Sequence, residues 1–251
     1  MAIFRRNLTA LTTLIAAFLG PVGHAQEAPV EPPAKFRTLA LGSVDVTDVF
    51  YDLKPGRTIS VSATGGSFSP AYPVPTGGVV SLYRMVPAVP PETKPRRLSL
   101  GEVTLGKGGP WLVLMKAPGA VDAPLQLQAI DDSWASHPVH TMRIFNFSKR
   151  RAAVNLGEAT FELITGGSRI ISYPSSATAQ VWMKVALMEE SGWELRVAGP
   201  KAMIPKTRST FILADAPIEP GRPDFIGVNT STLIDREPKP VKPASVLASQ
   251  P

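Results

Sequence analysis

The residues best suited to hold a metal ion lie together in one stretch, AIDDSWASHPVH, at residues 129–140. The potential ligands are Asp131, Asp132, His137 and His140, and these two histidines are the only ones that follow residue 25. Carboxylates and imidazoles are common metal ligands, and four of them can fill a site. Pro138 favours an extended conformation for the residue before it, so the two histidines are not expected to share a helix face. We favour a polar inter-domain segment here, with a metal site as the alternative.

No other pattern of catalytic residues stands out. The chain has no G-x-S-x-G nucleophile turn and no H-E-x-x-H zinc motif. It also has no cysteine, which excludes thiol catalysis and thiolate metal sites. A Ser-His-Asp triad would have to take its histidine from residues 129–140. We therefore expect no catalytic residues and no cofactor. The alternative is a hydrolase or metal-dependent enzyme with its site at that segment.

Four tryptophans are the other candidates for contact with a ligand, because their flat rings can stack on sugars. Trp134 and Trp193 lie near expected loops, so we predict that they are the surface residues. Trp111 and Trp182 lie in apolar stretches and are expected in the core. These positions make a carbohydrate-binding module a further alternative, with Trp134 and Trp193 as its platform.

The charge of the chain suggests no nucleic-acid partner. The formal net charge is +6, and subtracting Arg5 and Arg6 leaves about +4 for the rest, which is modest for its length. The basic clusters at 94–97 and 149–151 lack the interleaved aromatic residues that single-strand binding uses. We expect solvated loops there, with contact to an anionic polymer or a membrane surface as the alternative.

The first 25 residues have the pattern of a cleaved signal peptide. Arg5 and Arg6 precede a mostly apolar stretch at 8–20, and small residues at Gly23 and Ala25 suit cleavage. The apolar stretch is too short to span a bilayer as a helix, and none longer follows it. We expect a secreted or periplasmic protein with no integral membrane segment in the mature chain. A Pro-rich linker is expected at 26–35, and a Pro-rich, largely disordered tail at 219–251.

Between these ends the sequence predicts an all-β protein. Residues 57–63 alternate apolar and polar side chains, as a half-buried strand does. Gln180–Glu190 is the best helical competitor, but its apolar residues also suit a strand. Short strands separated by Gly, Pro, Asn, Asp or Ser are typical of sandwiches and barrels. The other expected strands are 37–42, 46–53, 78–85, 97–105, 111–117, 125–130, 141–147, 160–164, 169–173, 179–188, 192–198 and 209–215.

A ten-residue pattern, T-G-G-S-x-x-x-x-Y-P, occurs at residues 64–73 and again at 165–174. Similar strands precede and follow both copies in the same order, which indicates an internal duplication. Paired glycines suit tight hairpin turns, because glycine adopts positive φ without strain. We expect one such hairpin corner in each of two domains, with Tyr72 and Tyr173 closing the edge of each core.

These observations predict two tandem β-sandwich domains of Ig-like type. The expected boundaries are 36–120 for the first domain, 121–140 for the inter-domain segment and 141–218 for the second domain. The leading functional hypothesis is a non-enzymatic binding or scaffolding module of the cell envelope or the extracellular space. Its partner would be a protein or an envelope polymer, held at a sheet edge or in the cleft between the domains.

Overall fold

Strands make up all the regular secondary structure of the described residues in this computed structural model. The structure describes residues 34–42, 45–88, 90, 93–106, 108–117, 123–174, 179–216 and 227–237, which belong to one compact unit, Pro33–Pro251. The predicted signal peptide at 1–25 and nearly all of the linker predicted at 26–35 lie outside these residues. No helix that could cross a membrane is found in the described part of the chain.

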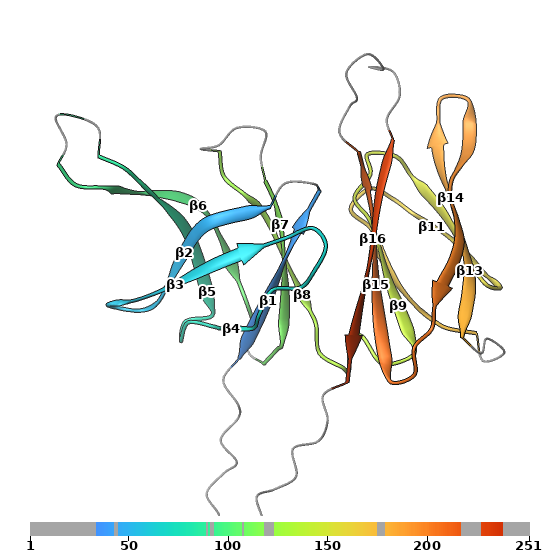
Figure 1. Cartoon of the computed structure of the whole chain (residues 1–251), viewed down its shortest axis with the longest axis horizontal. Coiled ribbons are helices and arrows are strands. Elements are labelled where there is room, and N and C mark those ends of the chain that lie inside the picture. The colour runs from blue at the N-terminus through green and yellow to red at the C-terminus, as the bar shows by residue number, and fades with distance from the viewer. Residues whose placement is uncertain are drawn as a thin grey trace, which may run out of the picture. The chain divides into compact units, whose positions relative to one another are not determined.

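The first half of the chain forms two four-stranded sheets (Figure 1). One has the order β4-β1-β7-β8 and consists of β1 (Lys35–Leu41), β4 (Tyr72–Pro73), β7 (Trp111–Lys116) and β8 (Gln126–Asp131). The other has the order β3-β2-β5-β6 and consists of β2 (Val46–Lys54), β3 (Arg57–Ala63), β5 (Val79–Val86) and β6 (Arg96–Thr104). We call β1–β8 the first half.

The second half, β9–β16, also forms two four-stranded sheets. One has the order β12-β9-β15-β16 and consists of β9 (Thr141–Asn146), β12 (Ser168–Ser172), β15 (Thr207–Asp215) and β16 (Val228–Arg236). The other has the order β11-β10-β13-β14 and consists of β10 (Ala152–Leu156), β11 (Ala159–Leu163), β13 (Gln180–Glu189) and β14 (Gly192–Ala202). Adding eight to each strand number of the first half reproduces both strand orders. The single parallel pair also recurs, as β1 with β7 and as β9 with β15.

Each half has a hydrophobic core to which both of its sheets contribute. In the first half, Phe36 and Val113 of one sheet share a buried cluster with Tyr51 and Leu82 of the other. In the second half, a corresponding cluster joins β9 and β15 to β10 and β13. Period-two alternation sends every second side chain of each strand inward, and full burial of one large apolar side chain contributes about 1.5–3 kcal/mol.

A third buried cluster joins the two halves. Leu39, Leu112 and Leu114 come from β1 and β7, while Phe145, Ile212 and Leu233 come from β9, β15 and β16. These side chains lie on the faces of β1, β7, β9 and β15 opposite to those that fill the two cores. We call β4-β1-β7-β8 and β12-β9-β15-β16 the inner sheets, because they share this cluster, and the other two the outer sheets.

Most of the expected strands are confirmed, including the strand at Gln180–Glu189 in place of a helix. The expected hairpin at each T-G-G-S corner is wrong, because the residues link two different sheets: 64–67 lie between β3 and β4, and 165–168 between β11 and the start of β12. Of the four glycines only Gly166 has positive φ. Gly65 has another requirement, since a Cβ there would lie 2.5 Å from the carbonyl oxygen of Gly42.

Two strands lie outside the two ranges expected for the domains. β8 lies within residues 121–140, where an inter-domain segment was expected, and it pairs along its whole length with β7. β16 lies within the expected tail at 219–251, and it pairs with all nine residues of β15. The Pro-rich composition of this end hides β16, because its partner β15 ends at Asp215 and lies beyond a separate segment of the sequence. The part of the tail from residue 238 onward lies outside the described residues.

Candidate binding surfaces

The four expected metal ligands do not converge. Among the described residues, no group of three or more His, Asp or Glu side chains is placed to hold a metal ion. Asp131 is exposed and accepts a hydrogen bond from the backbone N–H of Ser133 at 2.8 Å. His140 is also exposed and has a positive φ of 58°. The two remaining residues, Asp132 and His137, are buried, and Arg208 binds the carboxylate of the first and the backbone carbonyl of the second.

Asp132 belongs to a buried ion cluster between the two halves. Its carboxylate lies 2.5 Å from the guanidinium of Arg37 on β1 and 3.0 Å from that of Arg208 on β15. Asp235 of β16 binds the same two arginines, at 2.7 and 3.0 Å. Burial raises the pKa of Asp235, but the hydrogen bonds and charges of the two arginines outweigh it, so the net shift is downward. Both carboxylates are therefore engaged by protein cations.

His137 lies next to this ion cluster, and its backbone carbonyl accepts a hydrogen bond from Arg208 at 3.0 Å. Its side chain is buried, and neither ring nitrogen has a hydrogen-bond partner among the described residues. Desolvation, with the nearby charges of Arg143 and Arg208, lowers its pKa to about 3. Such a histidine is neutral at physiological pH and a weak base. The ring of His137 is therefore poorly suited to act as a general base at physiological pH.

The tryptophans divide differently from the sequence expectation. Trp134 is half-buried, with the guanidinium carbon of Arg208 3.9 Å from its ring centroid, so it packs against the ion cluster. Trp193 is 41% exposed, and Trp111 packs against the first core, both as expected. Trp182 is not in the core, because its side chain is 53% exposed. The signal was available in the sequence: Val181, Met183, Val185 and Leu187 alternate with it, so they and Trp182 point to opposite faces.

The outer sheet of the second half therefore carries an exposed apolar surface on β13 and β14. Trp182 lies opposite Pro200 in the register, Ala186 opposite Leu195, and Met188 opposite Trp193. Leu195 is 60% exposed. Arg151 borders this surface, with its guanidinium 5.7 Å from the ring centroid of Trp193 and an ion pair to Glu162. We call the exposed residues Trp182, Trp193, Leu195, Ala198 and Pro200, with Ala186 and Met188, the aromatic face.

The aromatic rings on the corresponding face of the first half are covered by its own side chains, although Val79 and Met85 of β5 are 36% and 43% exposed there. Asp52 accepts hydrogen bonds from the hydroxyls of Thr58 at 2.7 Å and Tyr83 at 2.9 Å, and it forms an ion pair with Arg97. Arg97 in turn lies over the ring of Tyr83, 4.2 Å from its centroid. Tyr83 is only 8% exposed and its ring meets that of Phe50. This outer sheet offers no open aromatic surface at these positions.

No family model matches the chain, and no curated protein matches it.

Three of the six basic side chains in the two basic clusters form ion pairs with neighbouring carboxylates. Arg97 pairs with Asp52, Arg150 pairs with Glu189 and Asp215, and Arg151 pairs with Glu162. A phosphate or an acidic polymer would have to compete with these internal partners. The aromatic face is therefore a better candidate for binding than either cluster.

Proposed function

We propose that this protein consists of two tandem β-sandwiches that arose by duplication of one domain. The sandwiches would be Ig-like in architecture but not in strand order, because an Ig constant domain pairs a four-stranded sheet with a three-stranded one. The repeated strand order, the two separate cores and the equivalent positions of the T-G-G-S corners support this proposal. With β8 and β16 included, the domains extend beyond the limits of 120 and 218 expected from sequence.

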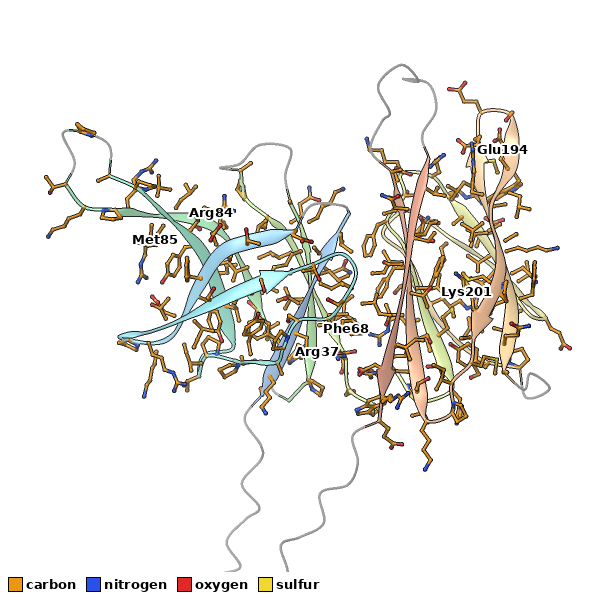
Figure 2. The ribbon with its side chains drawn as sticks, viewed as in Figure 1. Arg37, Phe68, Arg84, Met85, Glu194 and Lys201 are labelled. Atoms are coloured by element: carbon orange, nitrogen blue, oxygen red, sulfur yellow. The ribbon has the colours of Figure 1, made fainter. Side chains whose placement is uncertain are left out.

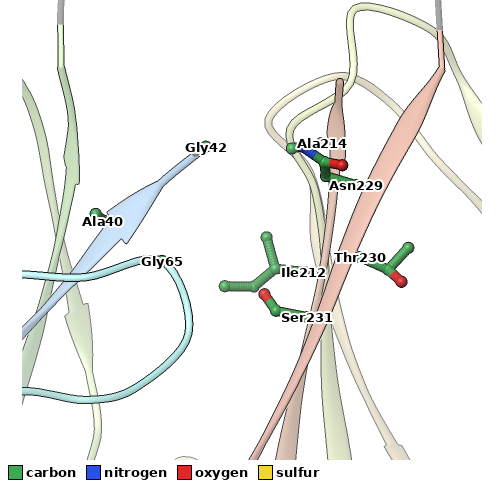
Figure 3. Close-up of a pocket in the computed structure, with 8 residues that line it drawn as sticks. All are labelled: Ala40, Gly42, Gly65, Ile212, Ala214, Asn229, Thr230 and Ser231. Atoms are coloured by element: carbon green, nitrogen blue, oxygen red, sulfur yellow. The ribbon is translucent and has the colours of Figure 1, made fainter. Parts of the chain in front are cut away.

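Two hollows between the halves support the duplication residue by residue. One, of about 200 Å³, lies between Gly65 of the first half and Ile212, Ala214, Asn229 and Ser231 of the second (Figure 3). The other, of about 430 Å³, lies between Gly166 of the second half and Leu114, Lys116, Gln126 and Gln128 of the first. In the register, Leu114 pairs with Gln128 as Ile212 pairs with Ser231, and Lys116 with Gln126 as Ala214 with Asn229. The two hollows are thus built from corresponding positions.

We further propose that the protein is an exported, non-enzymatic binding or scaffolding module. The observation that carries this proposal is the aromatic face, where Trp182, Trp193 and Leu195 are exposed on one sheet while the aromatic ring of Tyr83 on the matching sheet of the first half is buried. Tryptophan, methionine and arginine are enriched in protein interfaces, and buried tryptophans dominate their binding energy. The dispersed histidines and the absence of a catalytic motif support a non-enzymatic role.

A protein partner fits this face better than a polysaccharide. Sugar sites combine stacking rings with several groups that hydrogen-bond the hydroxyls, whereas the positions of this face between Trp182 and Trp193 hold Leu195, Ala186 and Ala198, with Lys184 as the one polar side chain among them. The two tryptophans are separated by about six residues of strand, or roughly 20 Å. A largely apolar strip of that length, interrupted on β13 by Lys184, suits the core of a protein interface.

Site-specific photo-crosslinking in cells that make the protein tests the proposal. A photoreactive amino acid at position 182 or 195 should yield a discrete adduct with one protein, whereas the same group at Ser81, on the outer face of the first half, should not. An adduct from position 198 should be lost when Trp182→Thr and Leu195→Thr are combined. Equal labelling from position 81, or labelling that the double change leaves intact, would contradict a docking role.

Binding to polysaccharide is the second outcome of the same design. Sedimentation of the purified protein with insoluble cellulose or with peptidoglycan sacculi, compared with the double variant, would identify it.

The export proposal has its own test. Removal of residues 1–25 should abolish the appearance of the protein in the periplasmic or secreted fraction.

A further inference from the structure

β16 is an edge strand without the features that usually protect an edge. Its nine residues pair with β15 without any register shift, and of the described residues only those of β15 pair with it. The stretch from Val228 to Ile234 contains no charge, no proline and no glycine. Long, regular and uncharged edges of this kind readily accept another strand.

The hydrogen-bond pattern shows which backbone groups β16 leaves open. The N–H of Ala216 donates to the carbonyl of Gly227, and the N–H of Glu237 donates to the carbonyl of Lys206. Hydrogen-bonded pairs alternate along an antiparallel ladder, so the odd-numbered residues of β16 bond to β15. Thr230, Thr232 and Ile234 consequently direct their backbone N–H and C=O groups away from β15.

The other long edge strands are protected. β14 contains Pro200, and a register shift interrupts its pairing with β13. β3 has two register shifts against β2. β6 has one shift against β5 and begins with Arg96 and Arg97. β8, the counterpart of β16 in the first half, is joined to β6 next to its start, where the N–H of Leu125 donates to the carbonyl of Leu100 at 2.7 Å.

Two hollows lie along β16, and the first half forms the opposite wall of both. The hollow of about 200 Å³ is bounded by Asn229–Ser231 and by Gly42 and Gly65 (Figure 3). A second hollow, of about 210 Å³, is bounded by Asp235, Arg236 and Ala71. Between Gly65 and Ala71 the chain places Phe68 against the cluster that contains Leu233. Figure 2 shows Phe68 beside Arg37, whose guanidinium is 4.2 Å from its ring centroid.

The unpaired charges beside the two hollows along β16 are positive and lie at one end of the strand. The Asn229–Ser231 end is uncharged, whereas Lys35 and Arg236 line the other hollow. Both are exposed, and neither forms an ion pair with a described residue, unlike Arg37 and Arg208 beside them. An incoming segment would therefore be favoured by acidic residues at the end that meets Arg236 and by uncharged residues elsewhere.

We propose that the edge of β16 binds an extended segment of a partner protein by strand addition, with acidic residues of that segment against Lys35 and Arg236. The backbone of the segment pairs with Thr230, Thr232 and Ile234, and its side chains enter the two hollows. Such pairing gives affinity through the main chain and selectivity through alternate side-chain positions. This surface lies on an inner sheet and is independent of the aromatic face.

Two synthetic peptides test the proposal with the full-length protein. Each is ten residues of alternating Thr and Val with two glutamates, placed at the N-terminus in one peptide and at the C-terminus in the other. Fluorescence anisotropy should show binding of one of them, because antiparallel and parallel addition bring opposite ends to Arg236. In the complex, amide exchange of Thr230, Thr232 and Ile234 should slow at least about tenfold, while the odd-numbered amides of β16 change little.

Variants of β16 complete the experiment. Thr232→Pro removes an outward N–H without removing a bond to β15 and should abolish binding, whereas the matched Thr232→Ala should retain it. Arg236→Glu should weaken binding about tenfold, the equivalent of one lost charge pair. This variant provides the test if Thr232→Pro does not fold. No binding by either peptide, binding unaffected by Thr232→Pro, or amides already protected in a dimer of the free protein would each overturn the proposal. Crosslinking from positions 182 and 195 would be unaffected, so failure here is distinguishable from failure of the aromatic face.

Discussion

The outer sheets of the two halves have the same strand order and opposite surfaces. In β3-β2-β5-β6 the outward side chains satisfy one another, with Asp52 holding Thr58, Tyr83 and Arg97. In β11-β10-β13-β14 the outward side chains include Trp182 at 53% and Leu195 at 60% exposed. The comparison indicates that two sheets of the same strand order can share apolar inward positions, which the core requires, while their outward positions differ.

The largest effect is expected where the halves meet, at two carboxylates that occupy corresponding places after β8 and near the end of β16. Asp132→Ala should lower the free energy of unfolding by about 3–5 kcal/mol, because it leaves buried Arg208 with one partner fewer. Asp235→Ala should cost less, because its side chain is 22% exposed against 3% for Asp132. Urea unfolding at pH 7 measures both, and equal losses would contradict the asymmetry.

Truncating one aromatic residue on each outer face tests the contrast between them, because the two losses of unfolding free energy should differ. Tyr83→Ala should lower the free energy of unfolding by about 3 kcal/mol, since it removes a buried ring and its bond to Asp52. Trp182→Ala, on the corresponding strand, should cost less than about 1 kcal/mol because the ring is already half in solvent. Thermal unfolding of the two variants tests this, and a large loss for Trp182→Ala would mean that its face is structural.

We expect the loss of folding stability in mild acid to arise mainly at His137, in the segment that follows β8. His137 faces Arg143, Arg208 and Asp235, and its pKa is lowered to about 3. Below pH 6.5 the unfolded chain therefore binds a proton at this histidine that the folded chain does not bind. The free energy of unfolding consequently falls by up to about 1.4 kcal/mol per pH unit until the pH nears 3. Asp52, Asp131, Asp215 and Asp235 have pKa values below 3.8, so their contributions are lost only at lower pH.

The measurement is the free energy of unfolding between pH 6.5 and 4.5. His137→Leu should flatten the slope, whereas His140→Gln, at an exposed position, should leave it unchanged. An unchanged slope in His137→Leu would show that another group controls the acid response.

The smallest effect is expected at two surface arginines that are equally exposed. The side chains of Arg97 and Arg151 are both 54% exposed, and each forms one ion pair and lies near an aromatic ring. Arg97→Ala and Arg151→Ala should each lower the melting temperature only slightly, and high salt should reduce both effects. Arg97→Ala should be the larger, because Asp52 also orders Thr58 and Tyr83. Paired thermal melts at low and high salt would detect the reverse order.

The strand pattern of this fold could be predicted from local sequence, but its boundaries could not. The alternation in residues 57–63 and 180–189 predicts strands, because period-two side chains follow from strand geometry. β16 was missed because its Thr-rich sequence lies next to a proline-rich end and its partner, β15, lies beyond an intervening segment. The expected hairpins were wrong for a related reason, since paired glycines permit a tight approach without specifying which sheets they connect.

The candidate site was predictable only in part. The clustering of Asp131, Asp132, His137 and His140 in sequence is real, but strand β8 ends within it and sends neighbouring residues to different environments. Asp132 is taken up by arginines from residues 37 and 208, which no local pattern links to it. Trp193 was placed correctly at the surface. Trp182 was assigned to the core because its neighbours are apolar, although its parity along the strand placed it on the opposite face.

The amino-acid sequence alone determined that the chain forms strands, that one face of most strands is apolar, and that a ten-residue pattern returns in the second half. Those properties are local, because they depend on backbone geometry and on the alternation of side chains. Only the tertiary contacts set whether the face of each sheet that points away from its own core is covered or exposed. The inner sheets bury theirs against one another around Leu114 and Ile212, whereas β13 leaves Trp182 in solvent. The reason is that coverage depends on which sheet is stacked on which, and stacking is set by contacts between residues far apart in the chain.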